Sequence, residues 1–196
     1  HMSVVAPTGA RAPDFQNLRF RELGRLSGHA WEQLELGRQQ GGAHLISLCN
    51  TAPIYKSAQS VVVHDTAVFD HPKAFSRRFS LWYRFMHRAL ARRGARFITV
   101  SKFSRHRIAK HLDLDEEEID VVPCAVDHMQ ATAPDFSVLD RLQLGRERIV
   151  LSVGSLNPYK NFGMLVDAAP RLGSSSTRVV VVGEKDSLSF RAAKLG

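Results

Sequence analysis

A lysine and a glycine flank a turn with the features of a phosphate-binding site. An apolar run, 149–153, leads into the turn at Gly154, and a segment with helical spacing begins near Asn161. The first turn of a helix carries unpaired backbone N–H groups and a partial positive charge, which attract phosphate. Lys160 adds a full positive charge at the same place. The pattern predicts that Lys160 and the backbone between Gly154 and Asn161 bind an anion.

Other polar residues follow predicted strands. His64 and Asp65 come directly after the apolar run 61–63. Ligands of open α/β sheets gather outside the carboxyl ends of the strands. His64 can hydrogen-bond a hydroxyl or a phosphate in either protonation state, although an isolated histidine more commonly bonds local backbone. Ser101 follows the apolar segment 96–100 and is placed to cap the helix after it.

Strands and helices alternate along the chain. The order strand, turn, helix, strand over 149–182 predicts a βαβ unit, whose apolar strands suit a parallel sheet buried on both faces. Further strands are expected at 45–49, 61–63, 96–100 and 119–122, and helices at 72–93 and 102–112. This pattern predicts an α/β fold.

The spacing of apolar residues also predicts which side chains are buried. The predicted helix 72–93 carries an apolar stripe, which we interpret as core, and Gly94 suits its end. The stripe consists of Phe75, Phe79, Trp82, Phe85, Met86, Ala89 and Leu90.

The first forty residues have few signals. Pro7, Gly9 and Pro13 are typical of a loop, and a short helix from about Ser27 would carry Ala30, Trp31 and Leu34 on one face. The two cysteines, Cys49 and Cys124, match no metal motif, and we expect them to be reduced and buried.

Four segments of the chain resemble segments of the retaining two-Rossmann-domain glycosyltransferases of family 4, and they occur in the order that this family shows. Residues 153–161 are similar to the segment V-G-x-x-x-P-x-K-N that opens the second domain of that family. The other three segments precede it: Val61-Val62-Val63-His64-Asp65, Val100-Ser101-Lys102-Phe103-Ser104-Arg105 and Val121-Val122-Pro123-Cys124-Ala125-Val126-Asp127. The pairing of Trp31-Glu32-Gln33 with residues 49–53 also resembles the middle of the first domain. Cys124-Ala125 departs from the family's usual Asn-Gly, which puts a tight-turn role there in doubt.

The resemblance implies a reaction. Members move a hexose from a nucleotide-sugar to a saccharide or lipid-linked acceptor with retention of anomeric configuration. Bacterial members with this pattern are often mannosyltransferases, so GDP-mannose is the first expectation for the donor. The family generally works without a bound metal or other cofactor, so the resemblance implies that none is needed here.

The resemblance also implies roles for residues. His64 is expected to be the catalytic residue, and Ser101 and Asp65 to bind acceptor or donor. The donor phosphates would be bound by Lys160 with Gly154, Ser155 and Asn161. Ser155 stands where many members carry arginine, so Lys160 would bear more of the phosphate interaction.

The resemblance covers the middle of a longer enzyme. It predicts the later part of a first Rossmann-like domain at 1–126, a linker at 127–147 and the start of a nucleotide-sugar-binding Rossmann-like domain at 148–196. The family's first glycine-rich loop and its paired glutamates have no counterpart in these 196 residues. We therefore expect the chain alone to lack efficient catalysis.

Composition and charge leave alternatives open. The 44% of hydrophobic residues is ordinary for a globular protein, and no apolar run is long enough to span a bilayer. We expect a cytoplasmic protein.

The net charge of +8 lies mostly between residues 73 and 110. This charge fits a solvated helix face, or peripheral contact with an anionic membrane surface at the inner face of the plasma membrane. A non-catalytic nucleotide-binding α/β protein would share the βαβ pattern. A basic nucleic-acid-binding protein would explain the high pI and is the less favoured alternative. No nucleic-acid partner is expected, because no zinc-finger, helix-turn-helix or aromatic RNA-binding signature is present.

Overall fold

The structure has two units. The computed structural model of the chain describes residues 2–12, 17–39, 42–130, 132–145, 148–154, 160–172 and 177–183. Contacts group residues 1–66 with 82–124 in the first unit, and residues 67–81 with 125–196 in the second. The domain boundaries expected from the sequence, at 126 and 148, stay a prediction.

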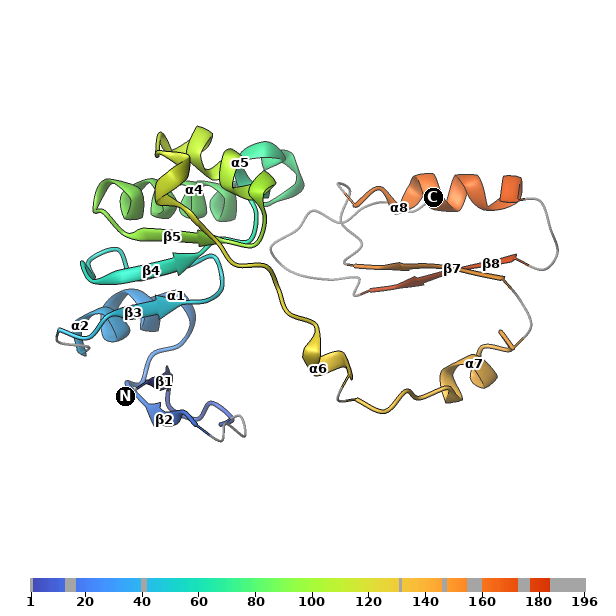
Figure 1. Cartoon of the computed structure of the whole chain (residues 1–196), viewed down its shortest axis with the longest axis horizontal. Coiled ribbons are helices and arrows are strands. Elements are labelled where there is room, and N and C mark those ends of the chain that lie inside the picture. Colours follow the sequence, from blue (N-terminus) through green and yellow to red (C-terminus); the bar gives the residue numbers. More distant parts are fainter. Residues whose placement is uncertain are drawn as a thin grey trace. The chain divides into compact units, whose positions relative to one another are not determined.

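A four-stranded parallel sheet forms the centre of the first unit (Figure 1). Its order is β3-β4-β5-β6, and the strands are β3 (Leu45–Ser47), β4 (Gln59–Val62), β5 (Arg96–Thr99) and β6 (Asp120–Val121). Val61 pairs with Phe97, and Ile98 pairs with Asp120. The predicted α/β fold with parallel strands is confirmed.

Helices α4 (Arg77–Arg92) and α5 (Lys102–Leu112) supply most of the helical part of the core. The side chains of Val61, Phe97, Met86, Leu90 and Ile108 are at most 2% exposed and pack in one cluster. Helix α5 has its predicted bounds. Helix α4 begins at Arg77 rather than at residue 72, because a 3-10 turn, Pro72–Ala74, follows the short helix α3 (Ala67–Asp70).

The apolar stripe of α4 is only partly core. Phe75, Met86 and Leu90 are buried as predicted, but Phe85 is 58% exposed, so its assignment to the core was wrong. Leu81, one turn before Phe85, is 66% exposed. A helix covered on one side buries a stripe narrower than its full set of apolar residues, and the excess faces water. Gly94, with φ 73°, follows the end of α4 as predicted.

The first forty residues contain more structure than predicted. Strands β1 (Ser3–Ala6) and β2 (Arg19–Glu22) pair in parallel where a loop was expected. Helix α1 (Gly28–Trp31) continues through a π-helical turn, Glu32–Leu36, into α2 (Gly37–Gln39).

The predicted apolar face of this short helix was also wrong. Glu32 and Leu36 are buried, whereas Ala30 is exposed and Leu34 is 48% exposed. The π-helical turn changes the angular spacing on which the expected face depended. Cys49 and Cys124 are free, but both are exposed and not buried as expected. Each lies in a loop just after a strand, where the chain leaves the core.

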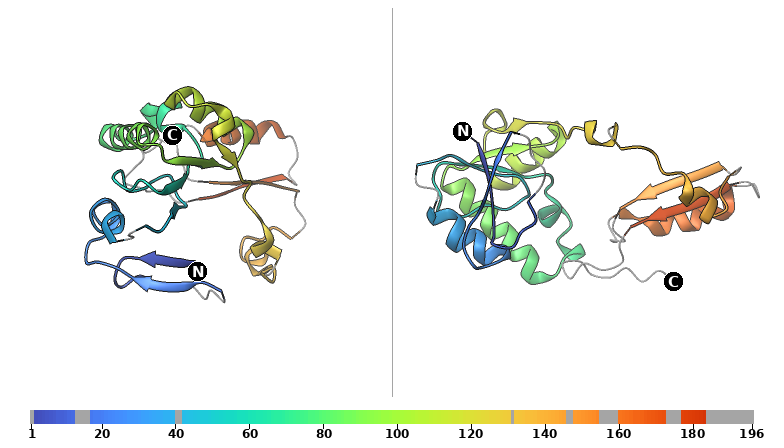
Figure 2. Two further views of the ribbon diagram at one scale, coloured as in Figure 1. Left: turned by 60° about the vertical axis from the view of Figure 1, so that its left-hand side comes forward. Right: turned by 90° about the horizontal axis from the view of Figure 1, so that it is seen from below.

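The second unit contains the predicted βαβ segment. Strand β7 (Arg148–Val153) pairs in parallel with β8 (Thr177–Val182), and α8 (Phe162–Ala168), continued by a 3-10 turn (Ala169–Leu172), lies along one face of the pair (Figures 1 and 2). Helices α6 (Asp127–Gln130) and α7 (Ser137–Arg141) precede it.

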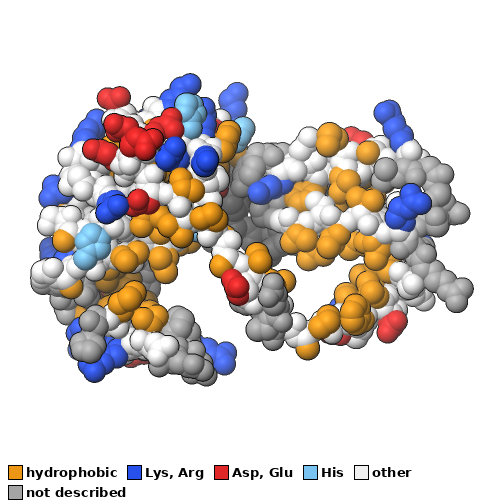
Figure 3. Space-filling model, in the orientation of Figure 1, with side chains coloured by type: hydrophobic (Ala, Val, Ile, Leu, Met, Phe, Trp, Pro, Cys, Tyr) orange, Lys and Arg blue, Asp and Glu red, His pale blue; other side chains and the backbone are white. Residues whose placement is uncertain are grey.

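The strands of this pair are more exposed than predicted. Leu151, Val153 and Val182 are 51 to 70% exposed, and hydrophobic side chains are visible over these strands in Figure 3. Burial on both faces was therefore wrong for the described residues, because a sheet of two strands with one helix leaves one face uncovered. Among the helices described, none is long and apolar enough to cross a membrane.

Candidate functional site

Three loops meet at the carboxyl edge of the first unit's sheet. Asn50 follows β3, His64 follows β4 and Ser101 follows β5. Because these neighbouring strands are parallel, their carboxyl ends lie at the same edge, where ligands of such sheets bind. The structure thus brings together three predicted residues, His64, Asp65 and Ser101, at the expected place.

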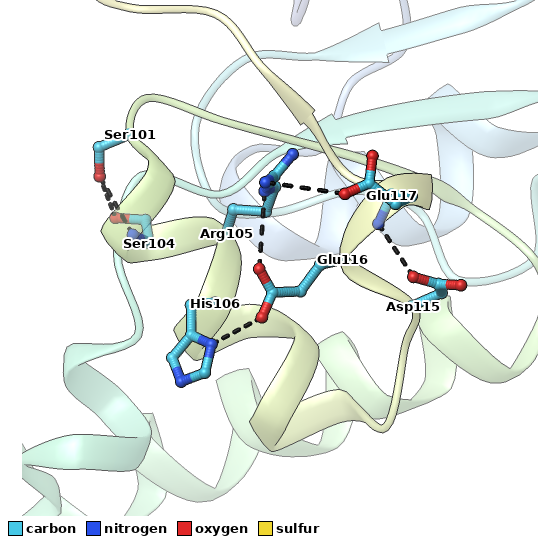
Figure 4. A network of polar contacts seen from close by, with 7 residues as sticks. All are labelled: Ser101, Ser104, Arg105, His106, Asp115, Glu116 and Glu117. Carbon is cyan, nitrogen blue, oxygen red and sulfur yellow. Dashed lines mark hydrogen bonds and ion pairs between the residues drawn. The ribbon is translucent and has the colours of Figure 1, made fainter.

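Hydrogen bonds connect Ser101 to His64 through Ser104. Ser101 caps α5 as predicted, its Oγ accepting from the Ser104 backbone N–H at 3.1 Å. The Ser101 hydroxyl donates to Ser104 Oγ at 3.1 Å (Figure 4). The Ser104 hydroxyl donates to the His64 carbonyl at 3.0 Å. The capping role is confirmed, and the cap is also linked to the backbone of the histidine. A ligand-binding role for Ser101 stays a prediction.

The imidazole of His64 is oriented by a backbone carbonyl. Its Nε2 lies 3.0 Å from the Leu48 oxygen, and only a protonated nitrogen can make this bond. In the neutral ring Nδ1 is then the acceptor. His64 can therefore accept a hydrogen bond from a hydroxyl group through Nδ1, or donate from it when the ring is charged.

Asn50 holds the backbone of His64. Its side-chain Oδ1 accepts from the His64 backbone N–H at 2.8 Å, and its own N–H donates to the Val62 carbonyl at 2.9 Å. Asn50 adopts a left-handed conformation, with φ 59°, which asparagine tolerates better than most residues. The loop after β3 is thereby tied to the end of β4.

His87, from α4, completes this network. Its Nε2 donates to the Asn50 carbonyl at 2.8 Å, and the residue is 2% exposed. Burial lowers the pKa of His87, an effect that the Asn50 bond and the nearby Asp65 charge partly oppose. The ring is therefore neutral at pH 7, with its proton on Nε2. This arrangement fixes Asn50, and through Asn50 it fixes His64.

Sequence reasoning missed the supporting residues Asn50, His87 and Ser104. A signal existed for one of them, because His87 lies four residues after Tyr83 and three before Leu90, on the inward face of a helix. A polar residue in such a place needs a buried partner. The sequence does not say that this partner is the carbonyl of residue 50.

The Trp31-Glu32-Gln33 segment contacts the loop after β3, with which it was paired by resemblance. The Gln33 amide donates to the Ala52 carbonyl at 2.9 Å, and its oxygen accepts from the Ile54 N–H at 2.9 Å. The Trp31 indole N–H donates to the Leu23 carbonyl at 2.7 Å. This segment therefore holds the loop that contains Asn50.

The acidic turn after α5 pairs with the helix instead of forming a site. His106 Nδ1 lies 2.6 Å from Glu116, and Arg105 lies 3.8 Å from Glu116 and 3.9 Å from Glu117 (Figure 4). Acidic and basic side chains lie next to one another in this part of the first unit in Figure 3. Within the described ranges, no three His, Cys, Asp or Glu residues are arranged to hold a metal ion. Independence from metal stays a prediction.

The predicted phosphate-binding residues belong to the second unit. Gly154 has φ 156°, a conformation that favours glycine, and its N–H donates to the Val182 carbonyl at 2.9 Å. Asn161, with φ 54°, begins α8, and its side-chain amide lies 3.8 Å from Met164 Sδ. Lys160, just before it, is exposed. Ser155 lies outside the described residues.

Two comparisons with known proteins match parts of this chain. Residues 40–130 match the model of Glycosyltransferase Family 4. A partial match, 26% identical over 137 residues, is to the O-antigen chain mannosyltransferase RfbU of Salmonella typhimurium. The match covers 70% of this chain and 35% of that relative, so the chain spans about a third of the relative's length.

Proposed function

We propose that the chain is part of an enzyme that transfers a hexose from a nucleotide-sugar to a saccharide or lipid-linked acceptor, because residues 40–130 match the model of Glycosyltransferase Family 4. The observation that carries the proposal is that the family segment contains the sheet edge with His64 and Ser101. We further propose that transfer retains the anomeric configuration. The mannosyltransferase relative supports mannose as the hexose, with GDP-mannose as the donor.

In the first unit, His64 is the residue that contacts the reacting sugar. The neutral ring accepts a hydrogen bond from a sugar hydroxyl through Nδ1, because its Nε2 carries the proton that is donated to the Leu48 carbonyl. Asp65 follows His64 in the same loop and lies near the His87 ring. Ser101 fixes the neighbouring loop and binds acceptor or donor. The hydrogen bonds from Asn50 and Ser104 to the His64 backbone hold His64 in a fixed position. A fixed position is what a residue that orients the substrate requires.

In the second unit, Lys160 binds the diphosphate of the nucleotide-sugar. Negative charge develops on the departing nucleotide as the glycosidic bond breaks, and an ammonium group stabilises it without a metal ion. Gly154 brings the backbone through a conformation that favours glycine, at the end of β7. Ser155 and Asn161 flank the same turn and are proposed to contact the phosphates.

Replacing His64 by alanine separates this function from plain nucleotide binding. We expect His64→Ala to lower the affinity for GDP-mannose by about tenfold and to leave the affinity for GDP unchanged. A loss of about tenfold corresponds to the free energy of one hydrogen bond between His64 and the sugar. Isothermal titration of both ligands measures the difference. Equal affinities of the unmodified chain for GDP and GDP-mannose, both insensitive to the variant, would favour a non-catalytic nucleotide-binding protein instead. Duplex binding with a steep salt dependence would favour a nucleic-acid-binding protein.

The exposed face of α4 supports a second, peripheral partner. Arg78, Leu81, Phe85 and Arg92 recur at spacings of three, four and seven, so they share one face, and α4 contains no acidic residue. Leu81 and Phe85 are 66% and 58% exposed. Basic residues with exposed apolar side chains suit an anionic lipid surface. We propose that this face contacts the inner, cytoplasmic leaflet of the plasma membrane.

Vesicle binding tests the α4 face. Leu81→Ser combined with Phe85→Ser is expected to weaken binding to vesicles containing phosphatidylglycerol by at least about tenfold. The reason is that the double variant has lost the two apolar side chains that would be buried in the lipid surface on binding. Phe136→Ser, at another residue 66% exposed, is the matched control and should bind like the unmodified chain. Co-sedimentation at low and high salt measures both variants. Equal binding of the double variant and the control would rule out this face.

A further inference from the structure

Glu32 is a buried carboxylate with an unsatisfied oxygen. The residue is 8% exposed and lies in the π-helical turn, a kind of irregularity that is frequent at functional sites. Its Oε1 has no hydrogen-bond partner among the described residues. Burial raises the pKa of Glu32, while a hydrogen bond from Thr51 and the neighbouring His29 act in the opposite direction. A buried carboxylate that costs stability and lacks a partner for one oxygen points to a ligand.

A second unsatisfied polar atom lies in the same cluster. The indole Nε1 of Trp82 is buried and, within the described chain, has no hydrogen-bond partner. The His29 ring contacts both residues: its Nδ1 is 3.6 Å from Glu32 Oε2, and its centroid is 5.9 Å from that of Trp82. An acceptor and a donor, both unsatisfied, therefore share the neighbour His29, whose side chain is 46% exposed.

Aromatic rings complete the cluster. Tyr83 lies edge-on to His29, with ring centroids 5.7 Å apart. Burial raises the pKa of the Tyr83 phenol, and the negative charge of Glu32 adds to this effect. Tyr83 also lies edge-on to His87, at 6.1 Å. The cluster thus adjoins the network that holds Asn50 and His64, and Thr51 connects the two along the chain.

We propose that Glu32, Trp82 and Tyr83 form a subsite for a neutral hexose ring of the acceptor saccharide, covered by His29 when empty. A sugar hydroxyl both donates and accepts, so one ring satisfies the Glu32 oxygen and the Trp82 N–H together, while its C–H surface packs on the aromatic rings. The carboxylate repels a diphosphate, which favours the acceptor sugar over the nucleotide. The identity of the ligand as an acceptor rests on the proposed function; the binding of a hexose does not.

The two tryptophans of the chain allow a direct test. Methyl glycosides of mannose, glucose, galactose and rhamnose are titrated into the ¹⁵N-labelled chain, and the two indole N–H signals are followed by NMR. At least one glycoside is expected to shift the Trp82 signal. The Trp31 signal should stay in place, because its N–H already donates to the Leu23 carbonyl.

Variants identify the carboxylate as the binding group. Glu32→Gln keeps the shape and is expected to weaken glycoside binding by about tenfold, as for the loss of a charged hydrogen bond. Glu117→Gln, at a side chain 83% exposed, is the matched control and should bind normally. His29→Ala removes the cover and is expected to bind the glycoside at least as tightly as the unmodified chain.

The outcomes separate the subsite from the proposed function. A folded chain whose Trp82 signal moves with none of the four glycosides overturns the subsite, and so does binding that Glu32→Gln leaves unchanged. The titration contains no nucleotide. Glycoside binding without any affinity for nucleotide-sugars would therefore support the subsite and remove the proposed transfer reaction, whereas binding of GDP-mannose without glycosides would do the reverse.

Discussion

A Phe97→Ala chain is expected to lose about 3 to 5 kcal/mol of unfolding free energy. Phe97 lies in β5, pairs with Val61 and is 2% exposed. Its ring belongs to the cluster that joins the sheet to α4 and α5, and the structure around a deleted ring relaxes only in part. Small domains have only about 5 to 15 kcal/mol in total, so this loss is a large fraction. Urea unfolding followed by circular dichroism measures it.

The matched control is Phe103→Ala. Phe103 is 74% exposed in the first turn of α5, and its replacement is expected to change the unfolding free energy by no more than about 0.5 kcal/mol. The same amino-acid change thus has a large effect in β5 and almost none in α5. Similar losses for the two variants would show that β5 is not at the centre of the core.

A His87→Leu chain is expected to be less stable by about 1 to 3 kcal/mol at pH 8, because the buried Asn50 carbonyl loses its donor. The loss should be accompanied by shifts of the backbone amide signals of Asn50 and His64, which the bond positions. His87→Gln can place an N–H near the same carbonyl and should recover part of the stability. Urea unfolding and amide NMR measure the two effects.

The pH dependence distinguishes a titrating histidine from a simple packing residue. Burial lowers the pKa of His87 in the folded state below the ordinary 6.5. As the pH falls below 6.5, His87 is protonated in the unfolded chain but stays neutral in the folded chain. The free energy of unfolding therefore decreases until the pH reaches the folded-state pKa of His87. His87→Gln should flatten this part of the stability curve. A variant curve parallel to that of the unmodified chain would show that His87 does not titrate in this way.

The elements that sequence reasoning found are those with local signals. Helix α5 has the bounds that its Ser101 cap and apolar spacing predicted, and β7, α8 and β8 follow the predicted order. The common edge of His64 and Ser101 follows from parallel strands alone. Local patterns therefore sufficed for the fold class and for the place of these two residues.

The supporting contacts could not be found in this way. His87 and Asn50 are 37 residues apart, and the bond between them depends on how α4 packs on the sheet. The burial of Glu32 depends on a π-helical turn that no apolar spacing predicts. The exposure of Phe85 likewise depends on which elements cover α4. These properties are set by tertiary packing, which overrides local preference.

The central claim is that the chain carries a binding site for a nucleotide-sugar with Lys160 at the diphosphate. Calorimetric titration with GDP, UDP and GDP-mannose, repeated for Lys160→Ala and for the control Lys110→Ala on the exposed end of α5, tests it most directly. The claim predicts binding of at least one of these ligands, weakened about tenfold or more by Lys160→Ala and unchanged by the control. A folded chain that binds none of them, or binds them equally well without Lys160, would contradict it.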